Sequence, residues 1–133
     1  MIREAGIYCR GYAEPLLFQN LDVYKLSLQL AIDLHKATLR FPKGTGYELG
    51  DQIRRAASSI PSNIAEGAMR NSPKEFIQYV AIARGSCAEL HTQLAIAQGV
   101  GILEAVEFQA KVERVGQMLT ALLKSLRSRS ESR

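Results

Sequence analysis

Two histidines and two cysteines are the side chains in this sequence best suited to metal binding or nucleophilic catalysis. His35 and His91 each have a carboxylate two residues away, at Asp33 and Glu89. Residues two apart on a helix point to different faces, so neither histidine gains a second ligand from its neighbour. The Glu-x-x-His motif of di-metal sites in helical bundles does not occur. We therefore expect no metal ion and no other cofactor.

The cysteines and glycines give no pattern typical of catalysis. Cys87 follows the apolar period of its segment and is expected to be a small buried hydrophobe, whereas Cys9 lies in an aperiodic segment without a base beside it. Glycines at 44, 46, 99 and 101 lack the lysine and strand of a phosphate loop, so they predict turns. We expect no catalytic site and no small-molecule substrate.

Adjacent arginines give the sequence its most distinctive charges. Guanidinium groups are rigid donors that suit carboxylate or phosphate, and Asp51 lies three and four residues before Arg54 and Arg55. Salt bridges within or between subunits are the favoured interpretation, with nucleic-acid contact as the alternative. Residues 127–133, with Arg127 and Arg129, supply half of the net charge of +4 and could also contact phosphate.

Periodic apolar residues predict the first two helices. Asn20 is a candidate N-cap for the first helix, and Pro42, Gly44 and Gly46 are expected to end it. The buried stripe of this helix is expected at Val23, Leu26, Leu30, Leu34, Ala37 and Phe41. A second helix is expected from about Glu48 to Ala68, with its stripe at Leu49, Ile53, Ala56, Ala57, Ile60 and Ile64. Pro61 lies inside this pattern, so we predict a helix bend near residues 57–61.

Two further helices complete the pattern. Ser72, Pro73 and Glu75 form a clear helix start, and the apolar seam that follows reaches Ala97 before Gly99 and Gly101. A fourth helix is expected over about 103–126, with a stripe at Phe108, Val112, Val115, Leu119, Leu122 and Leu126. Short connections force sequential helices to run antiparallel. The sequence predicts an all-α, up-down-up-down antiparallel four-helix bundle over residues 20–126, after an irregular arm (1–19) and before a basic tail (127–133).

The first helix carries more apolar surface than one bundle needs. Leu28, Ile32 and Leu39 form a second stripe, roughly half a turn from the core stripe. Ile82 and Ile96 lie off the seam of the third helix, and Gly85 in its middle is explained if another backbone approaches closely. We expect a homo-oligomer that uses Leu28, Ile32, Leu39 and Gly85. The alternative is a monomer with a thicker core or with the N-terminal arm over this stripe.

Composition excludes other classes of protein. With 133 residues, of which 47% are hydrophobic, the chain is long enough for one core. No apolar stretch is long enough to span a bilayer, and the first residues do not form a signal peptide. Two cysteines are too few for a disulfide framework, so we expect a cytoplasmic protein.

A family resemblance rests on one run and several shorter motifs. The run QIRRAASSIPSNIAEG, residues 52–67, resembles the signature of the bacterial 23S rRNA intervening-sequence protein family, a family of four-helix bundles. Shorter matches are Leu21-Asp22-Val23-Tyr24, Phe41-Pro42, Glu75-Phe76, Gly85-Ser86, Glu89-Leu90 and Thr92-Gln93-Leu94. The resemblance covers about Asn20 to Leu126 and leaves the arm and the tail outside.

The resemblance implies a small cytosolic bundle that assembles into a ring, commonly a homopentamer, without enzyme activity. In this family, ribosomal RNA binding is inferred from the position of some genes. Distantly related bundles are accessory proteins of reverse transcriptases in diversity-generating elements. We therefore expect a non-enzymatic, ring-forming scaffold with itself, and RNA, as candidate partners. The alternative is a protein-protein adapter or an accessory subunit of a nucleic-acid enzyme.

Overall fold

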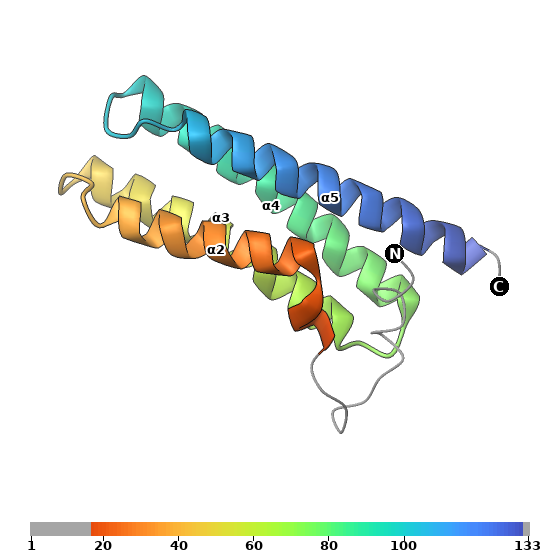
Figure 1. Cartoon of the computed structure of the whole chain (residues 1–133). Helices are drawn as coiled ribbons and strands as arrows, with labels where there is room; N and C mark the ends of the chain where they lie inside the picture. Colours follow the sequence, from red (N-terminus) through yellow and green to blue (C-terminus); the bar gives the residue numbers. More distant parts are fainter. Residues whose placement is uncertain (1–16, 132–133) are drawn as a thin grey trace.

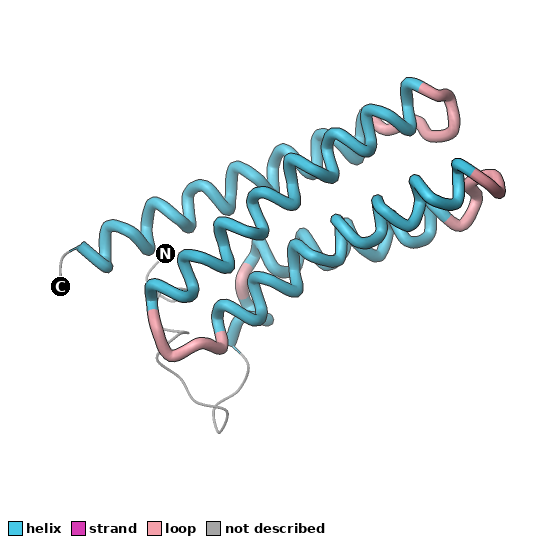
Figure 2. The backbone as a smooth tube through the Cα atoms, turned by 180° about the vertical axis from the view of Figure 1, so that it is seen from behind, coloured by secondary structure: helices cyan, strands magenta, loops and turns pink. Residues whose placement is uncertain are grey.

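A computed structural model describes residues 17–131, and residues 1–16, 132 and 133 lie outside that part. A short 3-10 helix, η2 (Leu17–Asn20), precedes the four α-helices, which are α2 (Asp22–Thr38), α3 (Thr45–Ala68), α4 (Pro73–Gly99) and α5 (Val106–Glu131). Sequential helices run antiparallel side by side, and α2 also meets α5, which closes the bundle (Figure 1). The described residues contain helices and loops but no strand (Figure 2). The predicted all-α up-down bundle is confirmed.

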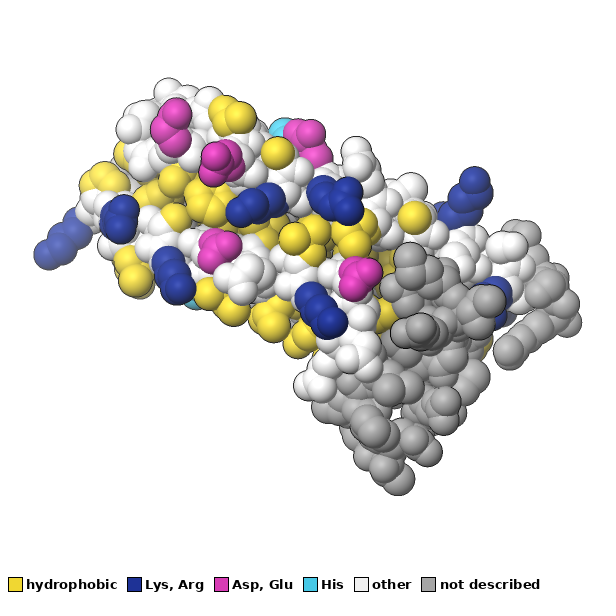
Figure 3. All heavy atoms as spheres, in the orientation of Figure 1, with side chains coloured by type: hydrophobic (Ala, Val, Ile, Leu, Met, Phe, Trp, Pro, Cys, Tyr) yellow, Lys and Arg dark blue, Asp and Glu magenta, His cyan; other side chains and the backbone are white. Residues whose placement is uncertain are grey.

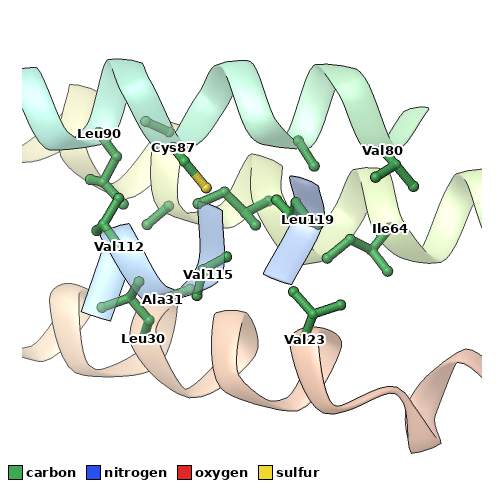
Figure 4. Packing of buried hydrophobic residues seen from close by; sticks show 14 of the residues in the cluster. Val23, Leu30, Ala31, Ile64, Val80, Cys87, Leu90, Val112, Val115 and Leu119 are labelled. Atoms are coloured by element: carbon green, nitrogen blue, oxygen red, sulfur yellow. The ribbon is translucent and has the colours of Figure 1, made fainter. Parts of the chain in front are cut away.

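The core is built from the apolar stripes that the sequence pattern predicts. All seven seam residues of α4 are buried, from Phe76 to Ala97. The close view in Figure 4 shows side chains of all four helices pointing toward one another, among them Leu30 of α2, Ile64 of α3, Leu90 of α4 and Val115 of α5. Five residues of the predicted stripes are only partly buried: Leu26, Ala37, Phe41, Leu49 and Phe108.

The start of α2 differs from the prediction. Asn20 is the last residue of η2, and Leu21 occupies the N-cap position without a side-chain cap. The backbone N–H of Leu21 donates to the carbonyl of Phe18 at 3.0 Å, and both side chains are buried. Burying two large apolar side chains contributes more to stability than one polar N-cap does. The prediction that Asn20 caps the helix was therefore wrong.

Several other helix ends lie elsewhere than predicted. α2 ends at Thr38, and α3 already begins at Thr45, because Gly44 with a φ of 87° makes the tight turn before it. α5 begins at Val106, three residues later than predicted. The residue before it, Ala105, donates its backbone N–H to the side-chain oxygen of Gln98 at 2.8 Å. It continues to Glu131, beyond the end expected near residue 126, so Arg127 and Arg129 of the predicted basic tail lie on a regular helix.

Small residues bring α3 close to both of its neighbours. A Cβ added at Gly50 would lie 3.5 Å from Thr38 Cβ of α2, and one added at Gly67 would lie 2.5 Å from Tyr79 Cβ of α4. Ser59 Oγ of α3 and Ser86 Oγ of α4 form a hydrogen bond of 2.7 Å. These contacts fix the rotation of α3 about its own axis.

Pro61 is buried inside the single helix α3. The helix continues through it, and the predicted bend at this residue stays a prediction. The start of α4 is as expected, since Ser72 Oγ accepts a bond from the Glu75 N–H at 3.4 Å and Pro73 opens the helix.

Candidate functional site

The outer face of α2 carries the second apolar stripe that the sequence pattern predicts. Leu28 and Ile32 are each 39% exposed and Leu39 is 81% exposed. We call these three residues the α2 stripe. In Figure 3, hydrophobic side chains follow the lower edge of the molecule over α2. All three side chains thus remain at least partly exposed beside the rest of the described chain.

A second exposed apolar row runs along the outer face of α4. Ile82, Ile96 and Val100 are 52%, 49% and 64% exposed, and we call them the α4 stripe. Glu89 is exposed and lies midway between Ile82 and Ile96, at seven-residue steps that keep all three on one face. The α4 stripe is therefore a second exposed apolar surface of the described chain.

Gly85 lies next to the α4 stripe on the exposed side of the helix. An added Cβ at this position would meet nothing within 4 Å in the described chain. A glycine in mid-helix costs about 1 kcal/mol relative to alanine. No contact among the described residues accounts for that cost, and the predicted contact with another subunit stays a prediction.

An open hollow of about 550 Å³ lies at the end of the bundle where α2 turns into α3. Its walls come from that turn, from the first turns of α3 and from the end of α4. Its apolar lining consists of Pro42, Leu49, Ile96, Val100 and Ile102. The hollow therefore continues the α4 stripe inward and can accept an apolar side chain.

Arg54 and Arg55 have different partners. Arg55 pairs with Asp51 at 3.2 Å on the surface of α3, one of the two pairings that the spacing allowed. The Arg54 guanidinium instead donates to Thr38 Oγ1 of α2 at 2.8 Å, and that hydroxyl donates to the carbonyl of Leu34 at 2.8 Å. The structure thus does not combine the two arginines into one phosphate-binding fork.

Sequence reasoning missed a polar cluster at the corner between α3 and α4. Arg70 donates to Glu66 Oε2 at 3.1 Å and to the Tyr79 hydroxyl at 2.7 Å, and it lies 3.9 Å from Glu75 Oε1. Its carbon Cζ is 5.1 Å from the centre of the Tyr79 ring. The bond to Glu66, with the field of Tyr79, raises the pKa of Arg70. The i,i+4 spacing of Glu66 and Arg70 could have indicated the pair, but nothing in the sequence points to Tyr79.

His91 and Glu113 form a second missed pair, across the groove between α4 and α5. Their Nε2 and Oε2 atoms are 2.9 Å apart. Cys87 lines the same groove, and burial raises the pKa of its thiol to about 11, so the sulfur stays protonated and unreactive near neutral pH. His35 is exposed on α2, with Nδ1 2.8 Å from the carbonyl of Ala31. Cys9 lies outside the described residues.

The described residues give no arrangement for metal chemistry or membrane insertion. Within residues 17–131, no three His, Cys, Asp or Glu side chains are grouped so that they could hold a metal ion. In the same part of the chain, no helix combines the length and the apolar character that crossing a bilayer requires.

A family model described as 23S rRNA-intervening sequence protein matches residues 19–121. The chain belongs to this family. The match confirms the resemblance found in the sequence and includes the α2 stripe, the α4 stripe, Arg54 and Arg55. It ends before Arg127 and Arg129, in the last turns of α5. A comparison with curated proteins finds no match.

Proposed function

We propose that this chain is a non-enzymatic helical scaffold of the cytoplasm that assembles with copies of itself into a closed ring. The observation that carries the proposal is the α2 stripe, three large apolar side chains that stay exposed on the outer face of α2. Fully burying one leucine or isoleucine side chain contributes about 1.5–3 kcal/mol, so covering the α2 stripe would supply part of the free energy that association requires. Exposed apolar stripes of this kind mark interaction surfaces in soluble proteins.

Charge reversal on the α2 stripe tests self-association. We expect the wild-type chain to have the mass of a small oligomer in light scattering and the double variant Leu28→Glu with Ile32→Glu to have the mass of a monomer. Two carboxylates placed in an apolar interface would lose their hydration without gaining a partner. Both positions are partly solvated, so the fold should tolerate the change.

Val106→Glu is the matched control, because Val106 is 61% exposed near the start of α5 and belongs to neither stripe. This variant should keep the wild-type mass. A wild-type protein that is monomeric at every concentration would contradict the proposed function.

RNA is a second candidate partner because α5 carries a set of exposed cations. Within the described residues, no ion pair involves Lys111, Arg114, Lys124 or Arg127, and all four are exposed. The family description names an intervening sequence of 23S rRNA, a polyanion that would gain counterion-release energy on such a surface. Arg54 is the weaker candidate, because it already donates to Thr38.

Fluorescence anisotropy with a labelled fragment of ribosomal RNA tests this second candidate. We expect binding at low salt that weakens steeply as salt is added. Replacing Lys124 and Arg127 by glutamine should reduce the slope of log K against log salt by about 2, and Arg54→Gln should change it less. If the RNA does not bind even at low salt, the chain is not an RNA-binding protein.

A further inference from the structure

A second open hollow, of about 880 Å³, lies at the corner of the bundle where α3 turns into α4, and we call it the corner hollow. Its apolar part comes from Phe18 of η2 and from Ala65 and Met69 at the end of α3. The carbonyl of Phe18 accepts a bond from the Leu21 N–H at 3.0 Å, and its ring meets that of Tyr24 edge to face, with 5.1 Å between the ring centres. One wall of the corner hollow is therefore an aromatic side chain held in a fixed position.

The rim of the corner hollow is acidic. Glu66 and Glu75 line it, and Arg70 is the one cation among its described lining residues, so one negative charge is in excess. Glu66 Oε2 accepts bonds from Arg70 at 3.1 Å and from the Tyr79 hydroxyl at 3.2 Å. Within the described residues, the Glu75 carboxylate makes no hydrogen bond, and its ion pair with Arg70 spans 3.9 Å. The Glu75 carboxylate is thus able to accept bonds from a further cation.

The segment before η2 contains groups that suit both parts of the corner hollow. Tyr12 has an aromatic ring, and Arg10 has a guanidinium group that binds a carboxylate through two parallel bonds. Pro15 disfavours the helical conformation for the residue before it, so an extended path is favoured there. In an extended segment, residues two apart such as Arg10 and Tyr12 point to the same side. Tyr12 is five residues before Leu17, and five extended residues span at most about 18 Å, so Tyr12 can reach the corner hollow.

We propose that residues 1–16 fold back into the corner hollow, with the Tyr12 ring against Phe18 and Met69 and with Arg10 paired to Glu75. This arrangement covers the apolar part of the hollow and neutralises the excess charge of its rim. A segment joined to Phe18 also has an advantage over a separate ligand, because a short flexible tether supplies an effective concentration on the order of millimolar. The α2 stripe stays exposed, so the inference is independent of the proposed ring and excludes the alternative in which this segment lies over α2.

Cysteine bridging tests this position, because Cys9 is a natural thiol next to Arg10. Asn71→Cys adds a second thiol on the exposed lining of the corner hollow. Gln29→Cys instead adds one on the exposed face of α2, beside the α2 stripe. Both changes are made in the full chain with Cys87→Ala, so that each variant has only the two thiols under test.

The rates of bridge formation under mild oxidation give the result. A disulfide requires two Cα atoms within about 7 Å, so each rate reports how often Cys9 visits that position. Cys9 is eight residues before Leu17, and eight extended residues span at most about 29 Å, so the chain is long enough for both bridges. We expect the Asn71→Cys bridge to form within one chain at least about ten times faster than the Gln29→Cys bridge. Non-reducing electrophoresis and peptide mass spectrometry measure both rates.

Tyr12→Ser should abolish most of this difference in rate, because it removes the ring that fills the apolar part of the hollow. Ile2→Ser is the matched control, since it removes one large apolar side chain from the same segment outside the proposed contact, and it should keep the difference. Equal rates for the two bridges, a faster bridge on α2, a bridge that joins two chains, or an unchanged difference in Tyr12→Ser would each show that the proposal is wrong. Circular dichroism checks the fold, and Ser62→Cys, also exposed in the lining, replaces Asn71→Cys if that variant does not fold.

Discussion

At the scale of single residues, two neighbours in the sequence have different partners because their side chains leave the helix in different directions. Arg55 points to solvent and pairs with Asp51, whereas Arg54 reaches across to α2 and donates to Thr38. Exposed ion pairs stabilise a fold by at most about 1 kcal/mol, and a hydrogen bond from a charged group to a buried hydroxyl contributes more. Arg54 is thus a structural residue of the α2–α3 contact.

Thr38→Val should destabilise the monomeric fold by about 1–3 kcal/mol. Valine matches threonine in shape but removes the acceptor for Arg54 and the donor to Leu34. Urea unfolding of the Leu28→Glu, Ile32→Glu background measures the change without a contribution from assembly.

Arg55→Gln is the matched control for this measurement and should change stability by less than about 0.5 kcal/mol. Equal losses of unfolding free energy for Thr38→Val and Arg55→Gln would show that the bond from Arg54 to Thr38 stabilises the fold no more than the exposed Arg55–Asp51 pair does.

At the scale of helices, local pattern and packing each decide different features. Periodicity identified the buried faces of all four helices, because a stripe at three- and four-residue steps is a property of one segment alone. The helix ends were less well predicted. The start of α2 depends on Phe18 and Leu21 reaching the core, and the extent of α5 depends on helix-favouring arginines continuing past Leu126.

Gly67→Ala should weaken the contact between α3 and α4. The new methyl group would lie 2.5 Å from Tyr79 Cβ and 3.1 Å from Phe76 Cδ1, so the helices must move apart. Overpacking costs about 1–3 kcal/mol, which exceeds the gain of about 1 kcal/mol in helix propensity. Thermal or urea unfolding should show a net loss of stability.

Gly116→Ala provides the comparison on α5, where the nearest atom is Cys87 Cβ at 4.0 Å. This variant should be more stable than the wild type by about 0.5–1 kcal/mol. If both alanine variants are stabilised, the close approach at Gly67 does not constrain the bundle.

At the scale of the whole molecule, one bundle leaves two apolar stripes at the surface. If assembly covers them, folding and association are linked. We expect the melting temperature of the wild type to rise by roughly 2–5 °C for a tenfold increase in protein concentration. The Leu28→Glu, Ile32→Glu variant should melt at one temperature throughout the same series. A wild-type melting temperature independent of concentration would argue against a linked oligomer.

The sequence by itself determined the helices, their buried faces, the exposure of Leu28, Ile32 and Leu39, and the family. These features follow from periodicity and from short motifs, which are local. Only the tertiary structure decided that Arg54 bonds to Thr38, that Arg70 meets Tyr79, and that His91 meets Glu113. It also showed that Ile82, Ile96 and Val100 stay exposed on α4. Such partners depend on how each helix is rotated about its axis, and close packing of all four helices together sets that rotation.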